Sequence, residues 1–180
     1  MGYYKTRGLR GSNLEELINR TNEQYMEDDL AVIQKIPTPI KPIELDSRKG
    51  VITLAYFDEK STVDYMGSVQ GIPVCFDAKE TKAPSLPISN IHDHQIDFME
   101  KFVAQSGLAF LIVNFTQADR YFLMDIGLLK KYYADAKKGG RKSVPMEAFD
   151  SALEVFRHNR YLVHYIEAIE KLAEKEEYNL

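Results

Sequence analysis

The stretch STVDYMGSVQGIPVCFDAKETK, residues 61–82, contains two runs of residues that are typical of β-strands, separated by Gln70 and Gly71. In TVDYMGSV and PVCFDAKE, apolar side chains alternate with polar ones, and the Gln-Gly pair marks a turn. We therefore expect two antiparallel neighbouring strands in the middle of a sheet. The preceding run VITLAYF has the same alternation and is predicted to be another strand of that sheet.

Charged side chains interrupt both strands at positions where a buried strand is normally apolar. Because successive residues of a strand face opposite sides, Thr62 and Asp64 share one face of the first strand. By the same rule, Cys75, Asp77 and Lys79 share a face of the second strand, and Val74, Phe76 and Ala78 face the core. A hairpin turn would bring the two polar faces together on one side of the sheet. An ordinary exposed hairpin remains the alternative.

Two carboxylates beside one ammonium group indicate a site for a hard divalent cation. Asp64 and Asp77 would repel each other unless a positive group lay between them, and oxygen ligands favour Mg²⁺ over zinc. A Mg²⁺ ion lowers the pKa of a bound water and neutralises charge on a phosphate. Lys79 can orient that water or stabilise the phosphorane. The pattern therefore predicts metal-assisted phosphodiester hydrolysis.

The remaining segments predict a mixed α/β domain. Ser12 and Glu15 form a capping-box pattern ahead of a helix over 13–27. Further strands are predicted at AVIQKI, LAFLIVNF and YFLMDI, and IPTPIKP is expected to be extended because prolines restrict the residues before them. Further helices are predicted from about 91 to Gly107, with Ser89 or Asn90 as the cap, and at LLKKYYADAKK, PMEAFDSALEVF and HYIEAIEKLAEKEE.

Composition restricts the class of protein. The 180 residues fit one domain, and the formal charge of −4 is weak evidence against a polyanion partner. The charge is uneven, because the first eleven residues hold three cations and no acid, while residues 165–180 hold five glutamates and two lysines. One cysteine excludes an internal disulfide, and neither a signal peptide nor a membrane span is evident. We expect a cytoplasmic protein.

Five blocks in this order and spacing resemble the RecU family of bacterial Holliday junction resolvases. They are EELINRTNEQY, AVIQKIPTPI, STVDY, FDAKETK and NIHDHQIDFM, and the resemblance covers roughly residues 8–142. It implies the restriction-endonuclease-like PD-(D/E)xK fold, a central mixed sheet flanked by helices. It also implies a homodimer that nicks two strands of a four-way junction, with Mg²⁺ as cofactor and Mn²⁺ as a substitute.

The resemblance assigns the site residues one by one. Asp64 matches the first acidic ligand, Lys79 the motif lysine and Thr62 a hydroxyl near the metal, while Gln95 matches a polar ligand that closes the site. Asp77 stands where the family usually has glutamate. The shorter acid would shift the cation or the strand by about an ångström, a displacement that can cost ~100-fold in rate.

Other residues receive supporting assignments. Glu16 and Tyr65 are predicted to support the metal ligands from just outside the site, with a solvated helix face as the alternative for Glu16 and capping as the role of Glu15. His92 and His94 are expected on different sides of a helix start, which disfavours a zinc site. The cations predicted to contact DNA, with simple solvent exposure as the alternative, are Lys35, Lys41, Lys82, Arg141 and Lys142.

These observations predict a basic N-terminal tail at 1–11 and a single nuclease domain at 12–180, with an arm at about 37–52 that also carries Arg48 and Lys49. The predicted function is a Mg²⁺-dependent endonuclease that resolves Holliday junctions by paired symmetric nicks in recombination and repair. The alternatives are a general DNA endonuclease with the same site and a catalytically weak junction-binding accessory protein. Recombinase or branch-migration proteins are candidate partners, and cleavage preference, metal number and chromosomal or phage origin are left open.

Overall fold

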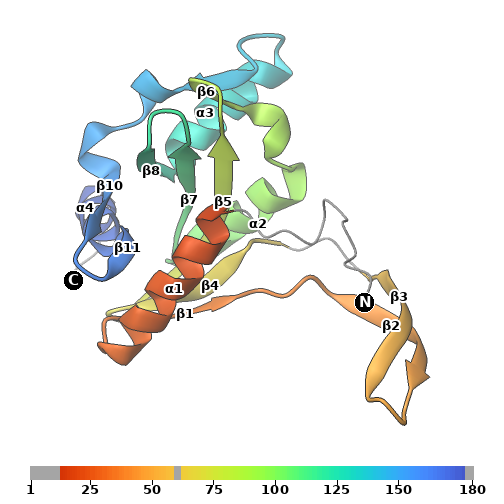
Figure 1. The fold of residues 1–180 in the computed structure, drawn as a ribbon. Coiled ribbons are helices and arrows are strands. Elements are labelled where there is room, and N and C mark those ends of the chain that lie inside the picture. Colours follow the sequence, from red (N-terminus) through yellow and green to blue (C-terminus); the bar gives the residue numbers. More distant parts are fainter. Residues whose placement is uncertain (1–12, 59–61, 177–180) are drawn as a thin grey trace.

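The computed structural model describes residues 13–58 and 62–176 and has mixed α/β architecture (Figure 1). Its helices are α1 (Asn13–Glu27), α2 (Asp93–Val103), α3 (Ile126–Lys137) and α4 (Ile166–Lys175), with the short 3₁₀ helices η1 (Ile88–Asn90), η2 (Met146–Ala148) and η3 (Ser151–Leu153). The first six strands are β1 (Ala31–Lys35), β2 (Ile40–Asp46), β3 (Val51–Phe57), β4 (Tyr65–Val69), β5 (Ile72–Thr81) and β6 (Ser85–Pro87). The others are β7 (Leu108–Phe115), β8 (Arg120–Asp125), β9 (Ser143–Pro145), β10 (Glu154–His158) and β11 (Tyr161–His164).

The central sheet has seven strands in the order β1-β4-β5-β7-β8-β10-β11. The pair β5 and β7 is parallel and the other neighbouring pairs are antiparallel, so the predicted mixed sheet is confirmed. Strands β6 and β9 form a separate, antiparallel two-stranded sheet. Among the described helices, none is long and apolar enough to cross a membrane.

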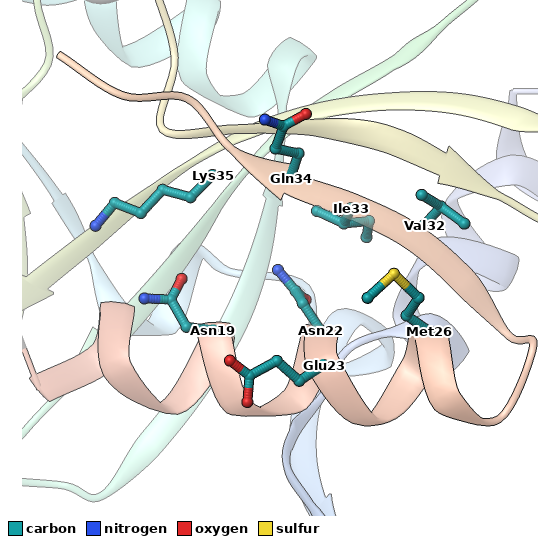
Figure 2. Close-up of a pocket in the computed structure, with 8 residues that line it drawn as sticks. All are labelled: Asn19, Asn22, Glu23, Met26, Val32, Ile33, Gln34 and Lys35. Carbon is teal, nitrogen blue, oxygen red and sulfur yellow. The ribbon is translucent and has the colours of Figure 1, made fainter.

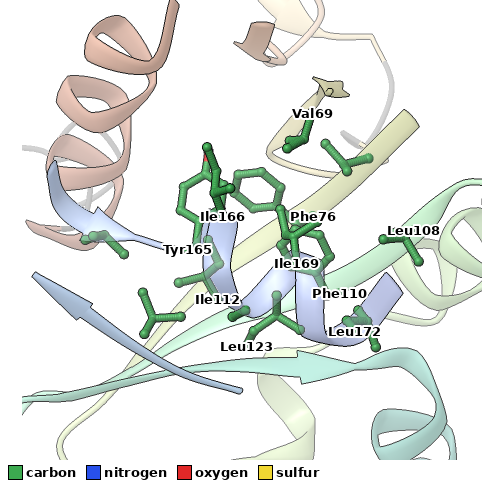
Figure 3. Packing of buried hydrophobic residues seen from close by; sticks show 14 of the residues in the cluster. Val69, Phe76, Leu108, Phe110, Ile112, Leu123, Tyr165, Ile166, Ile169 and Leu172 are labelled. Carbon is green, nitrogen blue, oxygen red and sulfur yellow. The ribbon is translucent and has the colours of Figure 1, made fainter. Parts of the chain in front are cut away.

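Both faces of the sheet are covered, which makes the central strands buried on two sides. One hydrophobic cluster joins α1 and α4 to side chains such as Phe76, Phe110 and Leu123 (Figure 3). The other joins α2 and α3 to the opposite side chains of the same strands, including Cys75 and Leu111. The rings of Phe76 and Phe110 stack with centroids 5.0 Å apart. The sheet is therefore a rigid layer on which polar groups can be held in fixed positions.

The predicted hairpin at the centre of the sheet is confirmed. Strands β4 and β5 are antiparallel, and Tyr65 pairs with Phe76 and Val69 with Ile72. The two-residue turn has positive φ at Gln70 (48°) and at Gly71 (90°), the combination that suits the twist of antiparallel strands. Val74, Phe76 and Ala78 lie in the cluster under α1 and α4, as the alternation predicts. Strand β4 begins at Tyr65, so Thr62 and Asp64 precede the strand instead of lying within it.

The predicted arm is a hairpin of β2 and β3 that projects away from the sheet (Figure 1). It runs to Phe57, beyond the predicted end near residue 52. VITLAYF, which forms β3, was predicted to belong to the central sheet, and this prediction is wrong because β3 pairs with β2 in a separate sheet. Its alternation specifies an extended strand, but it does not specify the partner. The predicted N-terminal tail at 1–11 and Ser12, the predicted cap of the first helix, lie outside the described residues.

Two further expectations are corrected. The PMEAFDSALEVF segment is not one helix but contains η2, η3 and the start of β10. Its apolar residues serve different sides of the sheet, since Phe149 packs with the α2 and α3 cluster and Leu153 with the α1 and α4 cluster. A single helix face cannot reach both. The helix predicted from about 91 begins at Asp93 with His92 as its cap, because Ser89 and Asn90 lie in η1.

Candidate metal-dependent active site

Asp64 and Asp77 lie next to each other where β4 meets β5. The backbone N–H of Asp64 donates to Oδ1 of Asp77 at 2.9 Å. In return, the backbone N–H of Ala78 donates to Oδ2 of Asp64 at 2.9 Å. Each carboxylate is thus bound to the backbone beside the other, so the hairpin itself fixes their separation. The structure therefore places the two carboxylates next to each other, as the sequence predicts.

Asp77 is fully buried, and two side-chain donors, one ammonium group and one amide group, contact its Oδ2. Lys79 Nζ forms an ion pair with Oδ2 of Asp77, and the Lys79 side chain is 16% exposed. Gln95 Nε2 from the first turn of α2 donates to the same oxygen at 2.6 Å. The predicted grouping of Asp77, Lys79 and Gln95 is therefore present, on one strand and one helix terminus.

Gln95 has a defined orientation because its other amide atom faces a donor. The backbone N–H of His92 donates to Oε1 of Gln95 at 3.1 Å, and an N–H group can bond only to the oxygen. The amino group must then face Asp77. Gln95 consequently positions Asp77, an arrangement that differs from the metal-ligand role predicted for its oxygen. The α2 cap and the acidic site are linked through this one side chain.

The electrostatics of the site favour a bound cation. Burial raises the pKa of Asp64 to about 6, and the charge of Asp77 adds to the rise. The Ala78 N–H and the charge of Lys79 act in the opposite direction but do not cancel it. Two crowded carboxylates with one ammonium leave an excess of negative charge in a largely buried place. The donors are carboxylate oxygens, and this set fits a hard ion such as Mg²⁺.

Tyr65 connects the acidic pair to α1. Its hydroxyl donates to Oδ1 of Asn19 at 2.8 Å and lies 3.2 Å from the backbone oxygen of Glu15. Burial raises the Tyr65 pKa, and the charges of Glu15 and Asp64 both add to the rise, so both acids act on the same ring. Asn19 was missed by the sequence analysis, although it lies four residues after Glu15 and therefore on the same helix face.

Of the two adjacent glutamates in the first turn of α1, Glu15 and not Glu16 faces the hairpin. Glu15 forms an ion pair with Lys35 of β1, whose Nζ is 5.9 Å from the centroid of the Tyr65 ring. The Glu16 side chain is 65% exposed and its carboxylate bonds Arg20 at 2.8 Å. The solvated helix face that was the alternative for Glu16 is therefore what the structure has.

Four more residues named in the sequence analysis have defined positions. Thr62 is half-buried and lies two residues before Asp64. Cys75 is fully buried in the cluster with α2, and burial raises the pKa of its thiol to about 12, as expected for a packed side chain. His92 and His94 were expected on different sides of the helix start, which is wrong, because their rings stack with centroids 5.4 Å apart. The extended backbone of His92 turns its ring toward the helix.

The cations predicted to contact DNA fall into two groups. Lys35 and Lys41 are in ion pairs with Glu15 and Asp58. Lys82, Arg141 and Lys142 are exposed, and the pairing of β6 with β9 puts Lys82 and Lys142 at opposite ends of that small sheet.

A separate groove of about 530 Å³ runs between α1 and the edge strand β1 (Figure 2). Asn22 and Met26 line it from the helix, and Ile33 lines it from the strand. Lys35 also borders it and pairs with Glu15, so the groove begins beside the contacts of Tyr65. The acidic pair is not among its lining residues.

The comparison with family models and the comparison with known sequences agree on one family. The family model of Recombination protein U matches residues 9–171, further along the chain than the expected end near 142. A Holliday junction resolvase RecU of Oceanobacillus iheyensis is 40% identical over 168 residues, which cover 91% of this chain and 86% of that protein. The Holliday junction resolvase RecU of a Geobacillus species is 38% identical over 176 residues, covering 92% and 85%. Among solved structures, the Holliday junction resolvase Hjc of Archaeoglobus fulgidus covers 65% of this chain and 78% of its own, with a TM-score of 0.39 and 10% identity, a likeness that carries no conclusion.

Proposed function

The chain belongs to the RecU family, and from this membership we propose that it is a Mg²⁺-dependent endonuclease that resolves Holliday junctions in DNA recombination and repair. The observation that carries the proposal is the buried pairing of Asp64 with Asp77, beside the ammonium group of Lys79. Relatives that match this chain over most of their length are named Holliday junction resolvases. The group of two acids and one lysine supplies the chemistry that phosphodiester cleavage needs. We place the protein in the cytoplasm, where its DNA substrate lies.

The roles of the residues follow from their contacts. Asp64 and Asp77 would hold Mg²⁺, or Mn²⁺ in its place, and Thr62 lies close to Asp64 in the chain. When bound, such an ion supplies a Lewis acid and a water of lowered pKa. Gln95 keeps the Asp77 carboxylate in one orientation through its fixed amide. Tyr65 keeps the hairpin against α1.

Lys79 has the position and charge to act on the scissile phosphate. Its Nζ reaches the metal-binding carboxylate, and its side chain is partly open to solvent. An ammonium group there can hold the attacking water or stabilise the negative charge that develops on phosphate oxygens. Because Asp77 is fully buried, the substrate would approach the site from the side where Lys79 lies.

We propose that the active form is a homodimer that makes paired symmetric nicks. A four-way junction presents two equivalent strands, and two sites related by a twofold axis match this symmetry. The projecting β2–β3 arm and the exposed cations Lys82, Arg141 and Lys142 are the parts of the chain proposed to contact DNA. Recombinase or branch-migration proteins are proposed as further partners.

The proposal is tested by incubating the purified protein with a labelled immobile four-way junction, with and without Mg²⁺. Symmetric nicked duplex products that require Mg²⁺ are expected from the wild type and not from Asp64→Asn. Flap and linear duplex DNA are cut in parallel reactions. Equal cutting of all three substrates would favour a general endonuclease of the same superfamily over a resolvase.

A second candidate is a junction-binding accessory protein with weak catalysis. Asp77 favours it, because this acid is one methylene shorter than glutamate and both of its oxygens already accept hydrogen bonds. A short acid held in this way reaches less far toward a cation. Tight junction binding without nicking at any Mg²⁺ concentration would support this candidate and contradict the first.

A further inference from the structure

A second group of metal-ligating side chains lies far from the acidic pair in the sheet order. His158 ends β10, His164 ends β11 and Glu167 lies in the first turn of α4. One ligand atom from each of the three lies within 4.8 Å of the others. Strand β11 is the edge of the sheet opposite to β1, and three strands separate it from β5. The two sites are therefore distinct.

The fold brings the three residues together by local geometry. The hairpin of β10 and β11 turns at Asn159, which has a φ of 52°, and its register shifts between Phe156 and His158. This irregularity lets the rings of His158 and His164 approach to 5.5 Å between centroids. Glu167 follows His164 by three residues, and its Oε1 lies 3.8 Å from Nε2 of His164.

His164 is held by a buried partner on its other nitrogen. The hydroxyl of Tyr25, from α1, lies 2.9 Å from Nδ1 of His164, and it also accepts the backbone N–H of Tyr165 at 3.0 Å. The Tyr25 oxygen also has a backbone hydrogen bond with Ile166, so the contact with Nδ1 anchors the imidazole and leaves Nε2 as the nitrogen that faces Glu167. Metal binding at Nε2 requires this nitrogen to be unprotonated, so binding would release any proton that it carries. Metal-ligating histidines commonly have a hydrogen-bond partner on the distal nitrogen, which fixes the orientation of the ring.

The ring of Tyr161 further restricts His164, since it stacks on the imidazole at 4.8 Å with an interplanar angle of 18°. The His164 side chain is 11% exposed, whereas Glu167 is 57% exposed and His158 is exposed. One ligand is thus fixed by packing, and the other two can rotate. In a tetrahedral zinc site the ligand atoms are about 3.3 Å apart, given metal–nitrogen bonds of about 2.0 Å. Small rotations of the exposed side chains would close the present spacing.

We propose that His158, His164 and Glu167 form a binding site for a divalent transition-metal ion of the zinc type. Two imidazoles and one carboxylate suit Zn²⁺, Co²⁺ or Ni²⁺ and not Mg²⁺, and they leave a coordination position for water. A bound ion would join the β10–β11 hairpin to α4 and, through Tyr25, to α1. The site would act as a clamp on the C-terminal edge of the sheet, independently of the nuclease chemistry.

The test is a Co²⁺ titration of the full chain in excess Mg²⁺, followed by visible absorption. The wild type should bind one Co²⁺ per chain with the spectrum of a nitrogen-ligated ion. His158→Ala and Glu167→Gln should each weaken this binding at least ~10-fold, because each removes one of three protein ligands. Both residues are exposed, so circular dichroism should show an unchanged fold. Zn²⁺ should raise the Tm of the wild type by about 2–4 °C or more and leave that of His158→Ala unchanged.

Two controls make the result specific. His94→Ala, in the stacked pair at α2, should keep the Co²⁺ site, since the chain has four histidines and this pair is the other candidate. Asp64→Asn should also keep it, so a failed nuclease assay and a failed metal assay are distinguishable. Equal Co²⁺ affinity in the wild type and His158→Ala, loss of binding in His94→Ala, or no binding above the Mg²⁺-saturated background would each overturn the proposal.

Discussion

Two antiparallel hairpins follow one another along the chain, and they are used in opposite ways. The arm hairpin, β2 and β3, is exposed along almost its whole length and carries apolar side chains into solvent, namely Ile40, Ile43, Leu45, Val51, Ile52, Leu54, Tyr56 and Phe57. The central hairpin, β4 and β5, is covered on both faces and holds the two acids. The local sequence patterns are alike, but the neighbours differ.

This difference shows that one hairpin holds side chains in fixed positions, whereas the other projects from the body of the domain. In the central hairpin, packing fixes the backbone. The carboxylates of Asp64 and Asp77 therefore keep their hydrogen bonds to the backbone N–H groups of Ala78 and Asp64, respectively. In the arm, β2 and β3 pair with each other in a sheet separate from the central one, so the hairpin can extend from the body toward a substrate. Catalytic groups need fixed positions, whereas a surface that follows a branched DNA does not.

The largest expected effect is on stability and compares one phenylalanine from each hairpin. Phe76 is 0% exposed and Phe57 is 77% exposed. Phe76→Ala should lower the free energy of unfolding by about 3–5 kcal/mol, because it empties a packed aromatic stack. Phe57→Ala should change it by less than ~0.5 kcal/mol. Urea denaturation measures both, and a large loss from Phe57→Ala would mean that the arm packs against a second copy of the chain.

The next effect is on cutting and concerns the charged end of the central hairpin. Lys79→Ala should reduce junction cleavage by about 10²- to 10³-fold, since it removes the positive charge available to the phosphate. Asp64→Asn should abolish Mg²⁺-dependent cutting. Both variants should bind the junction within severalfold of the wild type, as measured by electrophoretic mobility shift.

Lys82→Ala is the matched control for Lys79, because Lys82 is an exposed lysine just beyond the end of β5. It should leave the cleavage rate of bound junction unchanged. If Lys79→Ala lost fold and binding together, a catalytic role for this lysine would be contradicted.

A smaller effect is expected from the residue that positions Asp77. Gln95→Met keeps the length of the side chain but removes the hydrogen bond to the buried carboxylate, so activity or Mg²⁺ affinity should fall by roughly 10- to 100-fold. A Mg²⁺ titration of the cleavage rate separates the two. Gln105→Met is the control, because Gln105 is exposed and lies just after the end of α2. Equal rates in the two variants would show that the Asp77 contact is dispensable.

How much of this could be predicted from sequence depends on whether the cause was local. The helix at 13–27 and the strand LAFLIVNF agree with α1 and β7, because periodicity and a continuous apolar run are local signals. The grouping of Asp64, Asp77 and Lys79 was also accessible, since one turn and the alternation of a strand determine it. The isolation of β3 and the path of residues 146–156 depend on tertiary neighbours, which no local pattern encodes.

The orientations within the site were harder to predict for the same reason. Glu15 and Glu16 are adjacent on one helix, and which of them faces the hairpin depends on how α1 docks on the sheet. The role of Gln95 depends on the backbone of His92, a contact within the helix cap that the residue types alone do not specify. The cluster at His158, His164 and Glu167 requires the irregular register of β10 and β11.

The smallest expected effect is on the pH dependence of stability and again concerns the central hairpin. The pKa of Asp64 is about 6 in the folded chain and near 3.9 when unfolded, so the folded state holds its proton more tightly. Its contribution therefore stabilises the fold below pH 4 and is lost as the pH rises to about 6. In the absence of Mg²⁺, the Tm of the wild type minus that of Asp64→Asn should decrease across this window. Mg²⁺ binds the ionised carboxylate, so adding it should raise the wild-type Tm more at pH 7 than at pH 5. A difference in Tm that does not vary with pH would mean that Asp64 is solvated like an ordinary carboxylate, and the buried hairpin would then differ from the arm in packing but not in charge.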